Sequence, residues 1–369
     1  MELDAGAGGP QAGHVDAAFW RGRRVLLTGH TGFKGSWLAI WLQALGAEVA
    51  GFSSGTPHES SLHVLAGVGE GMESFDGDVR DFEAVSHAVA RHRPEVVIHM
   101  AAQALVRPSF VDPRSTYEIN VMGTVNVLDA VRVADDVRVV VNVTSDKRYE
   151  NREWDWGYRE DEPKGGHDPY SNSKGCAELV TDAFRRSFFS GDSTTRLASG
   201  RAGNVIGGGD WAPERLVPDL MRAALSGEPV AVRSPRAVRP WQHVLCPLSG
   251  YLLLAQALWD DPGFADGWNF GPTDEDARPV SWIVERLAEL WPSGIRAVVD
   301  EAAGPHEARV LKLDSTRARL HLGWHPAWGL DEGLERVIAW YIAFGEHADL
   351  RAVTEAQIEE FTALGLAGP

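Results

Sequence analysis

The sequence predicts an α/β fold, in which a doubly wound parallel sheet is followed by a smaller C-terminal lobe. Between residues 24 and 201, short runs that are apolar on both faces alternate with longer stretches of helical periodicity. Such strands are buried between two helical layers, as in parallel sheets. After Gly203 the pattern of elements changes. Prolines separate shorter elements, and nine of the fourteen tryptophans lie in this part of the chain. The pattern therefore indicates a Rossmann-type sheet with an appended lobe.

Each element of the sheet is predicted from its own apolar pattern. The expected strands cover residues 24–28, 48–52, 95–99, 137–143 and 195–201, and the expected helices cover 33–45, 81–91, 116–133 and 169–189. We expect three regions: a disordered extension over residues 1–19, a Rossmann domain over 20–203, and a lobe over 204–369, with room for some lobe segments to return to the Rossmann domain. Ligands of such sheets bind at the carboxyl ends of the strands.

Composition excludes several classes of protein. The 369 residues carry 35 Lys and Arg against 52 Asp and Glu, and a formal charge of −17 repels nucleic acid. No run of 18 apolar residues exists, so we expect no membrane span. Two cysteines, Cys176 and Cys246, give no disulfide framework and suit the cytoplasm. The 13 histidines form no H-E-x-x-H motif, so we expect no metal.

A glycine-rich loop joins the first strand to the first helix. Gly29, Gly32 and Gly35 allow a tight turn and open a helix whose free N–H groups attract pyrophosphate. Their spacing is G-x-x-G-x-x-G rather than G-x-G-x-x-G, and we expect dinucleotide binding from the strand–turn–helix context. The candidate cofactor ligands of this loop are its three glycines together with Thr31, Phe33 and Lys34.

The residues that would bind the adenosine part of the cofactor do not select between NAD and NADP. An acidic residue after the second strand would select NAD, but Phe52 is followed by Ser53 and Ser54. We expect Asp78 to accept a hydrogen bond from the adenine amino group, and the alternative is that it caps the next helix. Residue chemistry alone leaves NAD and NADP open.

Two clusters of reactive side chains follow later strands. Ser145, Asp146 and Lys147 lie at the carboxyl end of the strand over 137–143, and the alternative is a capped turn with a surface ion pair. Tyr170 and Lys174 are four apart on one helix, so they share a face. A cation beside a phenol favours the phenolate, which predicts a base that works near neutral pH.

With the glycine loop, these clusters resemble the extended, nucleotide-sugar branch of the short-chain dehydrogenase/reductase superfamily. From about residue 20 to about residue 341, the chain resembles the CDP-glucose 4,6-dehydratase family. The resemblance rests on residues 28–38, 101–109, 120–130, 144–147, 149–160, 165–178, 239–252, 268–272 and 311–324. Lys147 stands where dTDP-glucose dehydratases carry glutamate. Arg148 replaces a small thiol residue, and Cys246 replaces an acid.

The resemblance implies loss of water from CDP-D-glucose, with NAD as a cofactor that is reduced and reoxidised in each turnover. Tyr170 and Lys174 would serve oxidation at C4, and Ser145 would hold the C4 oxygen. Asp146 and Lys147 would expel the C6 hydroxyl, with the roles of acid and base left open. Lys147 must be neutral to act as the base, and Lys34 or Arg148 could supply the nearby positive charge that favours this.

The resemblance also extends the set of binding residues. Further cofactor ligands are Ser53, Val79, Ala101, Ala102, Tyr170 and Lys174. The substrate ligands are Gln103, Asn204, Arg215, Arg239 and His306. The partner is a CDP-hexose, and a homodimer or a dimer of dimers is expected. The helix over 116–133 and the helix of Tyr170 would form that interface through Val121, Val125, Leu128, Leu179 and Val180, which could instead pack on the sheet.

Two other functions fit parts of the pattern. A nucleotide-sugar 4-epimerase or decarboxylase shares the glycine loop and the Tyr–Lys pair, but it does not need the Asp146–Lys147 pair. A sensor that binds NAD(P) without chemistry would not need Tyr170 and Lys174, and both are present.

Overall fold

The computed structural model describes residues 13–300 and 308–367. Its central feature is a seven-stranded sheet with the order β10-β6-β5-β4-β1-β2-β3, in which every neighbouring pair is parallel. The strands are β1 (Arg24–Thr28), β2 (Glu48–Ser53), β3 (Glu73–Asp76), β4 (Val96–His99), β5 (Val139–Val143), β6 (Arg196–Arg201) and β10 (Gly267–Asn269). The strand order reverses between β1 and β4, and ligands of doubly wound sheets bind at such a point. The predicted fold class is therefore confirmed.

Helices cover both faces of this sheet. Leu26 packs into one apolar cluster while its neighbours Val25 and Leu27 pack into the other, which is the alternation that a strand buried on both faces requires. The Leu26 side holds α4 (Phe82–His92), α7 (Gly123–Arg132) and α8 (Pro169–Ser187), and the opposite side holds α2 (Phe33–Ala44) and α10 (Leu245–Asp260).

The helix predicted over residues 116–133 runs without a break to Arg132, but it is not α-helical throughout. It consists of α6 (Pro113–Tyr117), a π-helical turn (Glu118–Met122) and α7. Within the turn, the buried Asn120 amide donates to Ser173 Oγ at 2.8 Å and to the Gln103 carbonyl at 3.0 Å. The extra residue of a π turn thus directs Asn120 inward, against α8 and the loop after β4.

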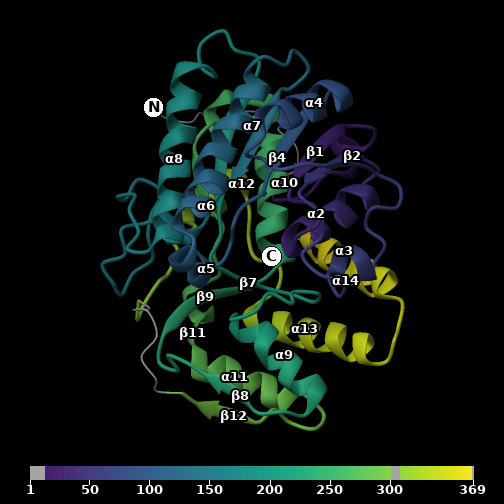
Figure 1. Ribbon diagram of the computed structural model, residues 1–369, viewed down its shortest axis with the longest axis vertical. Coiled ribbons are helices and arrows are strands. Elements are labelled where there is room, and N and C mark those ends of the chain that lie inside the picture. Colours follow the sequence, from purple (N-terminus) through teal and green to yellow (C-terminus); the bar gives the residue numbers. More distant parts are fainter. Residues whose placement is uncertain (1–12, 301–307, 368–369) are drawn as a thin grey trace.

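Beyond residue 203 the chain builds both the lobe and further parts of the Rossmann domain. The lobe contains a sheet of β7 (Asn204–Ile206), β9 (Val238–His243) and β11 (Ala277–Pro279), a second sheet of β8 (Val230–Val232) and β12 (Ala297–Val299), and the helices α9 (Leu216–Ser226) and α11 (Val280–Leu290). Figure 1 shows α9, α11, β8 and β12 at the end of the molecule away from β1 and β2. In contrast, β10 adds to the edge of the main sheet and α10 covers one of its faces.

The remaining elements are short helices and the C-terminal pair. They are α1 (Ala17–Trp20), α3 (Leu62–Leu65), α5 (Val106–Val111), α12 (Thr316–Leu322), α13 (Leu330–Gly345), α14 (Leu350–Ala367) and the 3-10 turns Asp146–Arg148, Pro262–Phe264 and Asp274–Asp276. None of the helices in the described ranges is long and apolar enough to cross a bilayer.

The expected disorder of residues 1–19 is wrong for residues 13–19. Trp20 is fully buried, and its indole N–H donates to Gln256 Oε1 of α10 at 2.9 Å. The backbone N–H of Asp16 donates to the same oxygen at 3.0 Å, and the Asp16 carboxylate caps α1. These hydrogen bonds hold the segment against α10, so it is ordered. Residues 1–12 lie outside the described residues.

Candidate active site

A cavity of about 1000 Å³ lies along the carboxyl ends of the strands and extends to the second lobe. Its walls come from the glycine loop after β1, the segments after β2 and β4, the end of β5, the start of α8, and β7 and β9 of the lobe. The cavity is large enough for more than one small ligand. It gathers most of the predicted site residues in one space.

The glycine loop forms a tight cradle at one end of the cavity. Gly29 has a φ of +75°, and a Cβ there would lie 2.8 Å from the Ala101 backbone nitrogen. A Cβ at Gly35 would lie 2.1 Å from the Gly29 carbonyl oxygen. Thr31 donates to the Gly55 carbonyl at 2.7 Å and lies 2.7 Å from the Ser53 hydroxyl, which fixes the segment after β2 against the loop. This close approach of backbone at a helix start fits a dinucleotide pyrophosphate.

Asp78 lines the cavity but does not cap a helix. Its carboxylate accepts from the Arg80 guanidinium at 2.6 and 3.0 Å, and this hydrogen bonding lowers the pKa of Asp78. Asp81 caps α4 by accepting from the N–H groups of Glu83 and Ala84. The alternative role of Asp78 as an N-cap is therefore wrong. Val79, Ala101 and Ala102 also line the cavity.

Asp146 is buried at the end of β5, where the chain turns into a 3-10 helix. Its N–H donates to the Ala202 carbonyl at 3.0 Å, and its Oδ1 accepts from the Ser145 hydroxyl at 3.0 Å. Its Oδ2 has no hydrogen-bond partner among the described residues. Burial raises the pKa of Asp146, against the charge of Lys147 and the Ser145 hydrogen bond. The alternative of a surface ion pair is wrong, because Asp146 is only 2% exposed.

Tyr170 and Lys174 face the same cavity from the first two turns of α8. Asp168 caps this helix by accepting from the Ser171 N–H at 2.9 Å, and the N–H of Tyr170 donates to the buried Ser109 hydroxyl at 3.1 Å. Burial lowers the pKa of Lys174 to about 8. Burial raises the pKa of Tyr170, and a hydrogen bond with Ser145 opposes that rise. In the protein alone, burial thus outweighs the expected stabilisation of the phenolate.

Lys34 reaches from the glycine loop toward this catalytic cluster. Its ammonium donates to the Tyr251 hydroxyl of α10 at 3.2 Å. Burial, together with the charges of Lys174 and Arg215, lowers the pKa of Lys34 to about 7. Tyr251 lies in the segment 239–252 on which the resemblance rests, but the sequence assigned it no role. Arg148, the other expected source of charge, donates instead to the Glu160 carbonyl at 2.6 Å and does not line the cavity.

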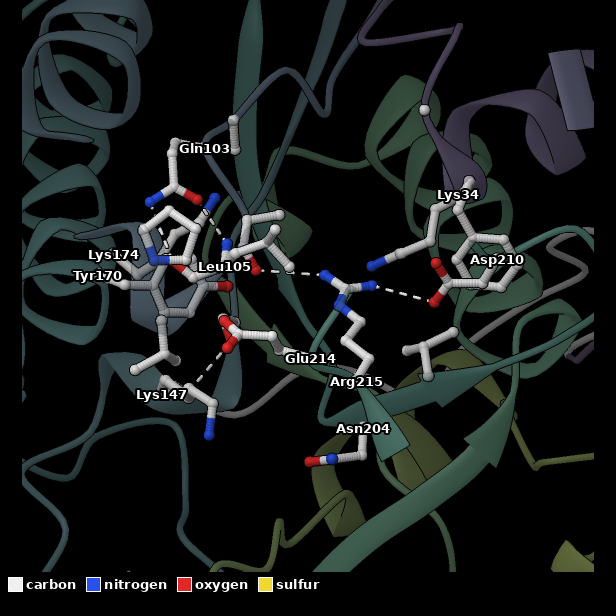
Figure 2. A pocket seen from close by; sticks show the side chains of 18 of the residues that line it. Lys34, Gln103, Leu105, Lys147, Tyr170, Lys174, Asn204, Asp210, Glu214 and Arg215 are labelled. Atoms are coloured by element: carbon white, nitrogen blue, oxygen red, sulfur yellow. Dashed lines mark hydrogen bonds and ion pairs between the residues drawn. The ribbon is translucent and has the colours of Figure 1, made fainter. Parts of the chain in front are cut away.

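The predicted substrate ligands are distributed around the far side of the cavity. Figure 2 shows Arg215 between Lys34 and Asp210 on one side and Tyr170 and Lys174 on the other. Its guanidinium donates to Asp210 Oδ2 and to the Ala104 carbonyl, both at 3.2 Å. It therefore links the lobe to the loop after β4.

The other predicted substrate ligands differ in how their side chains are engaged. Asn204 and Arg239 line the cavity from β7 and β9, and Arg239 donates to the Val238 carbonyl at 2.9 Å. The side-chain amide of Gln103 donates to the Leu105 carbonyl of its own loop at 2.9 Å and to the Thr116 hydroxyl of α6 at 3.1 Å. It therefore stabilises the protein rather than pointing freely into the cavity. His306 lies outside the described residues.

Comparison with known proteins agrees with this geometry. The family model described as the NAD dependent epimerase/dehydratase family matches residues 25–258. The chain belongs to this family. CDP-glucose 4,6-dehydratase of Salmonella typhimurium is 51% identical over 352 residues, which cover 94% of this chain and 98% of that protein.

More distant relatives share the fold along most of the chain. A dTDP-glucose 4,6-dehydratase of Xanthomonas campestris is 26% identical over 86% of this chain and 92% of its own length. Among solved structures, the UDP-glucose 4-epimerase of Thermus thermophilus, in complex with NAD, is 26% identical with a TM-score of 0.74. That match covers 86% of this chain and 99% of the epimerase.

Proposed function

We propose that the protein is an NAD-dependent CDP-glucose 4,6-dehydratase, which converts CDP-D-glucose to CDP-4-dehydro-6-deoxy-D-glucose. The observation that carries the proposal is the buried Asp146 carboxyl with an unpartnered Oδ2, next to Lys147 and in the same cavity as Tyr170 and Lys174. Elimination of water needs a proton donor and a proton acceptor that oxidation at one carbon does not need. The choice of CDP rests on the relative with 51% identity.

The residues of the glycine loop fit NAD. At Gly29, Gly32 and Gly35 no side chain covers the backbone at the start of α2, where a pyrophosphate is favoured. Asp78 lines the part of the cavity that would hold the adenosine. When bound, NAD⁺ supplies a hydride acceptor that is restored within the turnover and a positive ring charge that favours the Tyr170 phenolate.

Oxidation at C4 would use Tyr170 as the base. Its phenolate takes the proton of the C4 hydroxyl, and Ser145 would donate a hydrogen bond to the same oxygen by turning away from Asp146 Oδ1. The Lys174 cation stabilises the phenolate from one helical turn away. The resulting ketone at C4 acidifies the proton at C5.

Elimination would use the Asp146–Lys147 pair. Burial raises the pKa of Asp146, which favours its acid form, so its Oδ2 would give a proton to the departing C6 hydroxyl while Lys147 takes the C5 proton. Lys147 returns its proton to C5 as C6 is reduced. The proton that Tyr170 removed from the C4 hydroxyl restores Asp146 through solvent, so the only net loss is one water.

The second lobe would bind the nucleotide. Arg239, which is 7% exposed, offers a guanidinium fork for the pyrophosphate, and Asn204 offers an amide for a phosphate or sugar oxygen. Arg215 could join them only by changing its contacts with Asp210 and Ala104.

The proposal is tested by incubating the purified protein separately with CDP-, dTDP-, UDP- and GDP-glucose and measuring the product mass. We expect loss of one water from CDP-glucose, at a rate at least about 100-fold above the other three. An isomer of unchanged mass would instead indicate an epimerase. Bound NAD with no turnover of any nucleotide sugar would indicate a sensor.

We also propose a homodimer in the cytoplasm. Phe110, Val111, Met122 and Leu179 are apolar side chains about half exposed or more on α5, the π turn and α8. Leu128 packs on the sheet instead and would not take part. Both cysteines are free, which suits a reducing compartment. Light scattering that gives a mass near 40 kDa would contradict the dimer.

A further inference from the structure

Glu178 is a fully buried carboxylate on the helix that carries Tyr170 and Lys174. The three residues are spaced four apart, so they lie on one face of α8 in successive turns. Glu178 does not line the cavity. It ends the segment 165–178 on which the family resemblance rests, but the sequence assigned it no role. A buried carboxylate is costly unless it is fully hydrogen-bonded, so its position requires an explanation.

Both oxygens of Glu178 are held by neighbouring strands. Oε1 accepts from the Thr144 hydroxyl and, at 2.9 Å, from Arg201 Nε. Oε2 accepts from the Ser199 hydroxyl at 3.0 Å and from Arg201 Nη2 at 2.6 Å. Thr144 immediately precedes Ser145 and Asp146 at the end of β5. Glu178 therefore ties the segment of the elimination pair to the helix of the Tyr–Lys pair.

Three buried cations face Glu178, and Glu160 and Glu162 are further carboxylates near Arg201 and Arg148. Arg201 and Arg148 are both buried, and both lower the pKa of Glu178. Lys174 is buried as well, and Glu178 is the group that opposes the loss of its proton. Removing the charge of Glu178 would leave three buried cations with one fewer anion.

Lys174 has few other charged neighbours. Lys34 of α2 is a second cation nearby, since the charge of Lys174 lowers the pKa of Lys34. His99 of β4 is also affected by Lys174 and stays neutral, since its pKa is lowered to about 3. Tyr170 lies one turn earlier on α8. Among these groups Glu178 alone is an anion at neutral pH before substrate binds.

We propose that Glu178 is a positioning residue, which holds the end of β5 against α8 and supplies the negative charge that keeps Lys174 cationic beside Tyr170. The inference rests on the proposed function for the role of Tyr170 and Lys174. It assigns no contact of Glu178 with the substrate or with NAD.

The test compares Glu178→Gln with Glu178→Asp and with Asp182→Asn. Asp182 is one turn further along α8 and pairs with Lys164 and Arg185, away from the cavity, so its variant is the matched control. We expect Glu178→Gln to move the alkaline limb of the kcat profile about one pH unit lower. At pH 8.5 its kcat should fall about 8-fold relative to the wild type, with KM changed less than about 3-fold. Glu178→Asp should restore the limb, and Asp182→Asn should not move it.

A loss of kcat that is equal at every pH, with the limb unmoved, would overturn the proposal and leave Glu178 a purely structural residue. If Glu178→Gln does not fold, the double variant Glu178→Gln, Arg201→Met removes both members of the buried pair together. The limb should move less in the double variant than in Glu178→Gln, because a buried cation is lost together with the anion.

A second readout separates this inference from the proposed function. The titration of Lys174 can be followed without substrate by labelling with limiting acetic anhydride at a series of pH values and quantifying the peptide by mass spectrometry. We expect its midpoint to be lower in Glu178→Gln than in the wild type. An unchanged midpoint would contradict the inference whatever nucleotide sugar the enzyme uses.

Discussion

The Ser145 hydroxyl donates a hydrogen bond to Oδ1 of Asp146 at 3.0 Å, and Oδ2 of the same carboxyl is left without a partner among the described residues. Because both oxygens are buried, the carboxyl is held in one orientation and its pKa is raised. A protonated acid with one oxygen free to donate is the arrangement that protonation of a leaving hydroxyl needs.

Asp146→Asn should lower kcat by a factor of about 10² to 10⁴, the usual contribution of a general acid. Oxidation at C4 does not use Asp146, so NADH absorbance at 340 nm should rise on mixing with CDP-glucose and persist. Loss of the Asp146 acid form also lowers kcat in the wild type as pH rises, so Asp146→Asn should remove this part of the decline and leave the part set by Lys174. A variant that retains the wild-type rate of water loss would remove Asp146 from the mechanism.

Lys147→Ala should abolish water loss while leaving transient NADH detectable, because the base at C5 is missing but Tyr170 is intact. Rapid-mixing absorbance and product mass measure the two steps separately. Lys147→Glu is the informative companion, since glutamate stands here in dTDP-glucose dehydratases, and it should regain part of the activity. Product formation by Lys147→Ala at near the wild-type rate would show that another group is the base.

Gly35→Ala should purify with little or no NAD, because its Cβ would lie 2.1 Å from the Gly29 carbonyl oxygen and force the cradle open. Gly69→Ala is the control, since its nearest neighbour would be an ordinary 3.6 Å from the new Cβ. NAD released by heat and quantified by chromatography measures the effect. Equal NAD content in the two variants would contradict the assignment of the loop.

Stability should fall as pH falls below about 6.5, in part because of His99. Burial lowers its folded-state pKa to about 3, so between pH 6.5 and 3 the unfolded chain binds the proton and the folded protein does not. Acidification to pH 5 should cost about 2 kcal/mol from this group. His99→Gln should lose less stability than the wild type in urea unfolding at pH 5 against pH 7.5. An equal loss in both proteins would mean that His99 is not responsible.

The sequence predicted the strands that are apolar on both faces, because short runs without a polar face are typical of strands in a parallel sheet. It missed β3 and β10 for physical reasons. β3 is a mostly exposed edge strand of four residues (ESFD), and β10 has three residues and joins the sheet from far along the chain. Neither length nor periodicity separates such segments from loops.

The candidate site follows a similar division. Ser145, Asp146, Tyr170 and Lys174 were predictable, since they follow a buried strand or share a helix face, and the structure brings them to one cavity. No role was predicted for Tyr251 or Glu178, because each lies inside a helix and its partner is far away in the sequence. Only the fold brings Tyr251 to Lys34 and Glu178 to Arg201. The side chain of Gln103 was predicted to bind substrate, but the irregular loop it stabilises cannot be anticipated from local pattern.

The most direct test of the account follows one hydrogen atom. The enzyme is given CDP-glucose carrying deuterium at C4, and the product is analysed by mass spectrometry and by NMR at C6. Internal transfer between C4 and C6 predicts a product lighter than the substrate by one water, with the deuterium retained at C6. A dehydrated product without deuterium at C6, or deuterium that remains at C4 of an isomerised hexose, would contradict the account.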